Sequence, residues 1–176
     1  MRRIACWLAM ACSIGLTAHA AEVVVAQVSP ATGPLGPNGD ANYIGAKAYF
    51  DQINAQGGVA GQRIRFVRED DQYKPDETIR VMELVAQRDK PVAFVNALGS
   101  ANIAAVLKAG TLDKLAIPVV GVTPGADSPR SPGSRWMFHI QASDHAQLKR
   151  IVMHLSAMGI QRIAVDLSVR AVRGLY

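Results

Sequence analysis

A short polar stretch, Gly99-Ser100-Ala101-Asn102, holds residue types that suit anion binding. It opens a predicted helix, where free backbone N–H groups and the helix dipole attract an anion such as a carboxylate. The alternative is that Ser100 only caps this helix, and spacing alone favours the cap. The pattern therefore nominates Ser100 and Ala101 for ligand binding without deciding between the two interpretations.

A second stretch, Thr-Pro-Gly-Ala-Asp at 123–127, offers a different chemistry. Gly125 permits a ligand to approach the backbone closely, and the Asp127 carboxylate can accept a hydrogen bond from an ammonium group. Pro, Gly and Asp are also ordinary turn residues, so a plain turn is an equally good interpretation. Both interpretations remain open on the sequence.

The acidic run Glu69-Asp70-Asp71 is the third candidate. A metal site or an acid/base pair is conceivable there. Neighbouring side chains on an extended chain point apart, however, which makes it hard for these carboxylates to share one ion or proton. We therefore expect solvated or helix-capping carboxylates.

Other patterns argue against enzymatic and cofactor chemistry. The glycine-rich stretch 33–39 fits neither phosphate-binding pattern, and no G-x-S-x-G elbow occurs. The histidines of the predicted domain lack metal-ligand spacing: His139, His145 and His154. We predict a protein that is not an enzyme, with no catalytic residue, no metal and no cofactor.

The elements that position these stretches alternate between strands and helices. Apolar runs predict five strands: residues 23–28, 64–67, 92–95, 118–122 and 162–165. Amphipathic segments between them predict helices, the first capped by Asp40 and ended by Gly57-Gly58. Pro75 begins the next, Ser100 the third, and Asp144 with Gln147 forms a capping box for the fourth. Such alternation predicts an open parallel α/β sheet.

In a parallel sheet of this kind, ligands bind beyond the carboxyl ends of the strands. Four loops follow predicted strands and contain the candidate residues: 29–39, 69–74, 96–102 and 123–127. We therefore expect the site at one edge of the sheet.

The first twenty residues have the layout of a cleaved secretory signal peptide. Arg2 and Arg3 precede an uncharged apolar run over 4–16, and Ala-His-Ala at 18–20 forms a cleavage site. The run is too short to span a bilayer. The net charge of +5 falls to +3 without the two arginines, and the charges are scattered, so no nucleic-acid partner is expected. We predict a periplasmic protein.

Four stretches, taken together and in order, resemble a known family. They are GPLGPNGDANYIGA at 33–46, INAQGGVAGQRI at 53–64, EDDQYKPDET at 69–78 and PVVGVTPGAD at 118–127. The sequence is similar to the periplasmic solute-binding proteins of ATP-driven (ABC) importers, type I, in the leucine/isoleucine/valine-binding branch. The resemblance covers most of residues 22–165.

The resemblance implies a Rossmann-like fold of flavodoxin-type strand order, with helices on both faces of the sheet, as one lobe of a two-lobed protein. By position, Ser100 matches the family serine that holds a ligand carboxylate from a helix start, and Gly125 matches a residue that gives a backbone contact. Asp127 takes the place of a family threonine near the ammonium group, and Asn38 matches a residue lining the cleft. The implied ligand is an amino acid, an amide or a similar small carboxylate, and the implied partners are membrane permease subunits.

The domain organisation expected from this resemblance has three parts. Residues 1–20 are the signal peptide, 21–165 the amino-terminal ligand-binding lobe, and 166–176 a divergent tail that we interpret as a truncation or frameshift. The expected function is that of a solute-binding component, impaired by the missing lobe. Two alternatives are a ligand-sensing receptor domain that works with a partner protein and a small hydrolase that uses Ser100 with a histidine.

Overall fold

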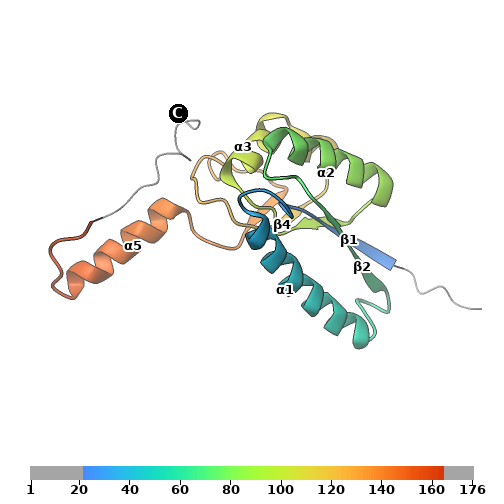
Figure 1. Cartoon of the computed structure of the whole chain (residues 1–176), viewed down its shortest axis with the longest axis horizontal. Coiled ribbons are helices and arrows are strands. Elements are labelled where there is room, and N and C mark those ends of the chain that lie inside the picture. Colours follow the sequence, from blue (N-terminus) through green and yellow to red (C-terminus); the bar gives the residue numbers. More distant parts are fainter. Residues whose placement is uncertain (1–21, 165–176) are drawn as a thin grey trace, which may run out of the picture.

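The computed structural model describes residues 22–164, and Figure 1 shows their arrangement. The predicted signal peptide (1–20) and divergent tail (166–176) lie outside the described residues. The elements run in this order: β1 (Glu22–Val28), α1 (Gly36–Ala55), β2 (Arg63–Glu69), α2 (Pro75–Asp89), β3 (Ala93–Val95), α3 (Ser100–Lys108), α4 (Thr111–Leu115), β4 (Val119–Val122), β5 (Met137–His139) and α5 (Asp144–Ala157).

The strands form one parallel sheet in the order β2-β1-β3-β4-β5. The chain moves outward from β1 to β2, then crosses back to β3 and continues in the other direction. The predicted open parallel sheet of flavodoxin-type order is confirmed. The connections after β1 and after β3 therefore run toward opposite edges of the sheet, and the loops that follow these two strands separate. Sheets of this kind bind ligands in the gap between two such loops.

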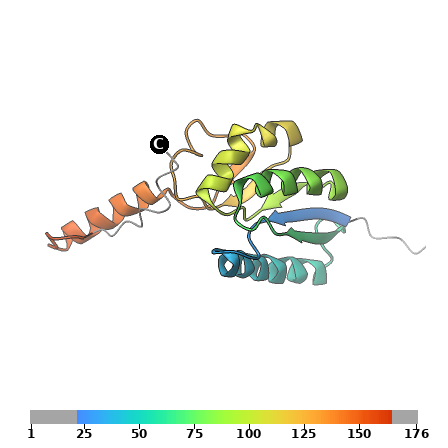
Figure 2. The same ribbon diagram turned by 45° about the horizontal axis from the view of Figure 1, so that its top comes forward.

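Helices lie on both faces of the sheet, as expected. Figure 2 shows α1 beneath the sheet and α2 and α3 above it. The hydrophobic core fills the space under α2, α3 and α4, and its largest buried side chains include Phe94, Met82, Ile103 and Leu112. Pro75 is the first residue of α2, as the sequence predicts.

Helix α1 begins earlier than expected, so the prediction that Asp40 caps it is wrong. The helix starts at Gly36, Leu35 precedes it without a side-chain cap, and Asp40 lies in the second turn. Pro37 suits a first helical turn because its missing N–H would have no partner there. Asp40 instead pairs with Arg68 of β2, at 2.5 Å.

The fifth strand is β5 at Met137–His139, and the predicted strand at 162–165 is wrong for its described part. The structure assigns no strand to residues 162–164, and Val165 lies outside the described residues. β5 pairs with β4 through Val119↔Met137 and Val120↔Phe138. The edge of β4 is therefore occupied by β5 before the chain reaches residue 162.

Helix α5 begins where the sequence predicts it, but the residue that caps it lies one position earlier than expected. Ser143 is the N-cap, and its hydroxyl accepts a hydrogen bond from the Ala146 amide at 3.3 Å, which corrects the assignment of this role to Asp144. Gln147 Nε2 donates to the Ala142 carbonyl instead of closing a box with Asp144.

Among residues 22–164, no helix combines the length and apolar character that a membrane crossing requires.

Candidate ligand-binding site

Ser100 and the loop after β4 meet at the carboxyl edge of the sheet. Ser100 is the first residue of α3, Gly99 is the N-cap, and no side chain caps this helix. The Ser100 hydroxyl instead accepts a hydrogen bond from the Ala126 amide at 3.2 Å. The simple helix-cap interpretation is therefore wrong, because this hydroxyl joins two loops that are 26 residues apart in the chain.

Gly125 is held in place by groups that the sequence did not point to. Its carbonyl accepts a hydrogen bond from the Asp144 amide at 2.8 Å, and Arg130 Nη2 donates to the carbonyl of Pro124 at 2.9 Å. A Cβ atom at Gly125 would lie 2.1 Å from Asp144 Oδ2. A larger residue here would have to displace the Asp144 carboxylate, so the close approach that Gly125 allows in this structure is that of Asp144.

The remaining predicted residues are exposed. Asp127 lies in the loop after β4, with His145 Nδ1 4.0 Å from its carboxylate. Asn38 lies in the first turn of α1, and Ala101 in the first turn of α3. The structure thus brings Ser100, at the start of α3, together with the 123–127 loop. No hydrogen bond joins Asn38 to these residues among residues 22–164.

Tyr73 is a residue at this edge that the sequence analysis did not single out. A Cβ atom at Gly99 would lie 2.6 Å from Tyr73 Cε2, so the ring packs against the start of α3. Tyr73 has φ +59°, a conformation that side-chain-bearing residues rarely adopt. Its amide donates to Asp71 Oδ1 at 3.0 Å, which helps to hold this backbone conformation.

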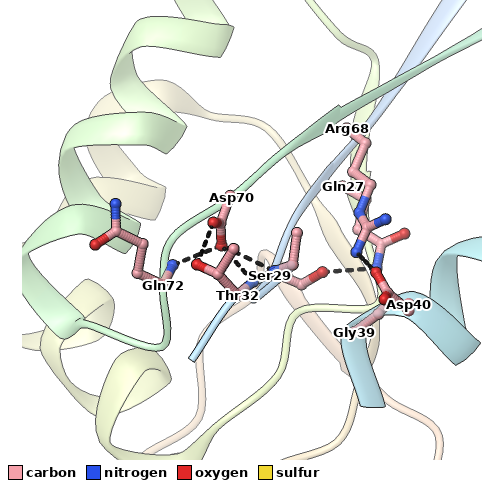
Figure 3. A network of polar contacts seen from close by, with 9 residues as sticks. Gln27, Ser29, Thr32, Gly39, Asp40, Arg68, Asp70 and Gln72 are labelled. Carbon is pink, nitrogen blue, oxygen red and sulfur yellow. Dashed lines mark hydrogen bonds and ion pairs between the residues drawn. The ribbon is translucent and has the colours of Figure 1, made fainter. Parts of the chain in front are cut away.

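Asp70 fastens the loop after β1 to the loop after β2, as Figure 3 shows. Its carboxylate accepts hydrogen bonds from the Ala31 amide at 2.8 Å, the Thr32 hydroxyl at 2.6 Å and the Gln72 amide at 2.8 Å. Partial burial acts to raise the pKa of Asp70, but these hydrogen bonds outweigh it and hold the pKa below its usual value.

Asp71 points the other way, into a dry network between α2 and α3. Thr78 Oγ1 donates to Asp71 Oδ2 at 2.7 Å, and Asn102 Nδ2 donates to Thr78 Oγ1 at 2.7 Å. All three residues are buried, so the expectation of a solvated carboxylate is wrong for Asp71. Burial raises the pKa of Asp71, although the hydrogen bonds from Thr78 and Tyr73 act against the rise.

Another polar network lies beside the start of α1, on the right of Figure 3. Gln27 is fully buried, and its Nε2 donates to the Ser29 hydroxyl at 2.7 Å. A Cβ atom at Gly39 would lie 1.7 Å from the Pro30 carbonyl oxygen, so α1 packs directly on the loop after β1. These contacts fix the position of the first turn of α1, which carries Asn38.

The residues of this edge show no metal centre. Within residues 22–164, no group of three or more His, Cys, Asp or Glu side chains is placed to share a metal ion. His139, at the end of β5, has a lowered pKa because of burial and the nearby Arg130 charge, and a hydrogen bond with the Pro129 backbone acts against this. What the edge offers is backbone amides, hydroxyls and single carboxylates.

Comparisons with known proteins agree with this geometry. The family model for periplasmic binding proteins matches residues 22–166. An amino acid binding protein of Pseudomonas aeruginosa is 30% identical over 143 residues, which make up 80% of this chain and 37% of that protein. The Leu/Ile/Val-binding protein of Escherichia coli K12 is 34% identical over 68 residues, which make up 39% of this chain and 18% of that protein.

Solved structures show the same partial coverage. A substrate-binding periplasmic protein from Ralstonia solanacearum aligns with a TM-score of 0.73 and 33% identity, over 78% of this chain and 38% of its own. An extracellular ligand-binding receptor from Verminephrobacter eiseniae aligns with a TM-score of 0.73 and 34% identity, over 79% and 39%. The chain therefore spans less than two fifths of each relative's length. The predicted resemblance is confirmed, and the chain belongs to the periplasmic binding protein family.

Proposed function

We propose that residues 21–165 form the amino-terminal ligand-binding lobe of a solute-binding component of an ABC importer. The relatives named above bind amino acids or unspecified ligands, and none is named as an enzyme. The ligand of this lobe is an amino acid or a related small carboxylate, and no bond is made or broken in it. The protein is exported to the periplasm on its signal peptide and delivers its ligand to permease subunits.

The observation that carries this proposal is the hydrogen bond between Ser100 and Ala126. Because Ser100 Oγ accepts from the Ala126 amide, its own hydroxyl proton remains available to donate. The amides of Ala101 and Asn102 precede the first intrahelical bond of α3, which Ile103 donates to Gly99. A hydroxyl and two amides at a helix start are suitable donors for a carboxylate.

The ammonium group of a free amino acid also has a partner of opposite charge at this edge of the sheet. The exposed carboxylate of Asp127 lies one residue after Ala126 and is available to accept a hydrogen bond from an ammonium group. Asn38 approaches from the first turn of α1 and offers amide groups to the remainder of the ligand. Such a site fixes the two charged ends of an amino acid and leaves its side chain to other contacts.

One lobe supplies only part of the contacts of a closed two-lobed site. If a closed site binds with about 8 kcal/mol, near micromolar, half of the contacts leave about 4 kcal/mol, near millimolar. The entropy cost of holding the ligand does not halve, which weakens binding further. We therefore expect this chain to bind an amino acid no more tightly than in the millimolar range.

A nuclear magnetic resonance titration tests the proposal. Amino acids and their C-terminal amides are added up to about 20 mM, and the backbone resonances of 100–102 and 125–127 are followed. We expect saturable shifts for at least one amino acid, with much smaller shifts for its amide because the carboxylate is lost.

Matched serine variants assign the effect to the site. Ser100→Ala should weaken the response at least fivefold, whereas Ser128→Ala, a change at an exposed serine nearby, should leave it unchanged. Absence of shifts at 100–102 with every amino acid would contradict the proposal. Micromolar binding would contradict the expectation that one lobe binds weakly.

A further inference from the structure

The start of α3 carries donor groups of the proposed site, yet no side chain caps it. Gly99 is the N-cap, with φ +102°, and it has no side chain to accept from the amides of the first turn. The first N–H groups of a helix have no partner within the helix, so an uncapped end frays unless other contacts hold it. The position of Ser100 and Ala101 therefore depends on contacts made outside the backbone of α3.

Asn102, the third residue of α3, makes such a contact. Asparagine side chains are mostly exposed in folded proteins, but Asn102 is only 1% exposed. Its Nδ2 donates to Thr78 Oγ1 at 2.7 Å, and Thr78 lies near the start of α2. A buried side-chain amide thus ties the first turn of α3 to the first turns of α2.

Asp71 anchors this tie to the loop after β2. Thr78 Oγ1 donates to Asp71 Oδ2 at 2.7 Å, and Asn102 Nδ2 lies 3.5 Å from the same oxygen. The other carboxylate oxygen of Asp71 accepts from the Tyr73 amide at 3.0 Å. Because Asp71, Thr78 and Asn102 are all buried, a group that loses its partner here has no water to replace it, which makes each bond costly to break.

The same network encloses Gly99, the residue before Ser100. A Cβ atom at Gly99 would lie 2.6 Å from Tyr73 Cε2 and 3.0 Å from Asn102 Oδ1. The ring and the amide therefore leave no room for the backbone of Gly99 to move toward them. Since Gly99 leads directly into Ser100, these two side chains limit where the proposed donors can lie.

We propose that Asn102 is a positioning residue of the ligand site. Through Thr78 and Asp71, its side chain holds the first turn of α3 where the Ser100 hydroxyl and the free amides can meet a ligand carboxylate. The Asn102 side chain does not touch the ligand, because it is buried between α2 and α3. This inference rests on the proposed function, since the groups that it positions are the donors proposed there.

A matched pair of threonine variants tests the proposal without ligand. Thr78→Val keeps the shape of the side chain but removes the hydroxyl that joins Asn102 to Asp71. Thr111→Val is the control: Thr111 is also 1% exposed, it begins α4, and within residues 22–164 its hydroxyl has no hydrogen-bond partner. Circular dichroism shows whether each variant is folded.

Hydrogen exchange at Ile103 reports how often the first turn of α3 opens. The Ile103 amide donates to the Gly99 carbonyl at 3.0 Å, and this bond closes the turn. Thr78→Val should accelerate its exchange about tenfold and shift the backbone resonances of 100–102. Thr111→Val should change neither. The amide of Phe94, in the core strand β3, serves as the reference for changes in overall stability.

Titration with L-leucine up to about 20 mM then measures the consequence for binding. The initial slope of the shifts at 100–102 against leucine concentration should fall to about a fifth in Thr78→Val, because the donors no longer keep their places. Thr111→Val should retain the wild-type slope. Thr78→Ser keeps the hydroxyl and should restore both the slope and the slow exchange of Ile103, which a purely packing role of Thr78 would not predict.

Asn102→Ala provides a second test, also if Thr78→Val does not fold. Alanine is a better helix former than asparagine, so propensity alone predicts a first turn that opens less often. We expect the opposite, an exchange rate at Ile103 that rises about tenfold, because the tie to α2 is lost.

Three results would overturn the proposal. Equal exchange at Ile103 in both valine variants would show that the network does not hold α3, and slower exchange in Asn102→Ala would show the same. Failure of Thr78→Ser to restore the leucine response would assign the loss to packing. An unchanged leucine slope in Thr78→Val would show that binding does not need this position of the turn. Absence of any response in the wild-type protein would contradict the proposed function instead, and the exchange rates would still decide whether Asn102 positions α3.

Discussion

The two faces of the sheet differ in how much of their surface the helices cover, although both carry similar residues. On the face covered by α2, α3 and α4, Phe94 and Val119 are almost completely buried. On the opposite face, Val120 and Phe138 are about half exposed. Valine and phenylalanine thus occur on both sides, and the placement of helices decides which of them enters the core.

Two polar clusters, one on each side of the sheet, differ in how exposed they are. Between α2 and α3, on the covered side, Asp71, Thr78 and Asn102 are joined by hydrogen bonds in a buried network. Near the half-covered face, Arg68 stacks over Tyr43 and pairs with Asp40, which is half exposed. A dry network is expensive to break, because a buried polar group that loses its partner has no water to replace it.

The largest expected difference between the faces is the cost of deleting one phenylalanine ring. Phe94→Ala empties a site in the closed core and should lower the free energy of unfolding by about 3–5 kcal/mol. Phe138→Ala removes a half-exposed ring and should lower it by less than about 1 kcal/mol.

Urea unfolding followed by circular dichroism measures both losses. Equal losses for the two variants would show that the sheet face carrying Val120 and Phe138 is as well buried as the core. That result would remove the difference between the faces.

Replacing either of two glycines in α1 by alanine should change the free energy of unfolding by a smaller amount. The change should have opposite signs at the two positions. Gly39→Ala places a Cβ 1.7 Å from the Pro30 carbonyl, and overpacking of this kind should cost about 1–3 kcal/mol. Gly45→Ala meets nothing within 4 Å and should stabilise the helix by about 0.5–1 kcal/mol. Thermal and urea unfolding measure both, and stabilisation by Gly39→Ala would show that α1 does not pack tightly on the loop after β1.

Much of the fold was predictable because most elements carry their own periodic pattern. The first four strands and the helix starting at Pro75 were recognised from apolar runs and from residues typical of helix ends. β5 was missed because Met137-Phe138-His139 contains no β-branched residue and follows a loop rich in proline and glycine, and it is a strand because β4 offers it an edge. The start of α1 was misplaced because Leu35 provides no cap signature.

The sequence predicted which loops form the candidate site, but not which contacts these loops make. The rule that ligands bind beyond the carboxyl ends of strands nominated the loops that contain Ser100 and Gly125, and the structure places these loops together. Sequence alone could not show that Ser100 bonds to Ala126, because this contact depends on how the two loops pack. Tyr73 was missed because its backbone conformation depends on a neighbouring carboxylate.

The smallest expected effect comes from the adjacent carboxylates Asp70 and Asp71, which face different parts of the molecule. The pKa of Asp70 is lowered, so its stabilising contribution is complete above the usual value of 3.8 and is lost as the pH falls through the lowered pKa. The pKa of Asp71 is raised by burial, so the fold favours its protonated form. That contribution is complete below 3.8 and is lost as the pH rises through the raised pKa.

The pH dependence of two isosteric variants should therefore have opposite slopes. Each of Asp70→Asn and Asp71→Asn should cost about 1 kcal/mol at neutral pH, since an amide replaces a carboxylate as hydrogen-bond acceptor. Between pH 7 and about pH 3, the loss caused by Asp70→Asn should shrink, because Asp70 of the unfolded wild-type chain takes up a proton before Asp70 of the folded protein does. The loss caused by Asp71→Asn should grow, because protonation relieves the wild-type protein of a buried charge. Urea unfolding across this range measures both differences, and slopes of the same sign would show that the two carboxylates have similar surroundings.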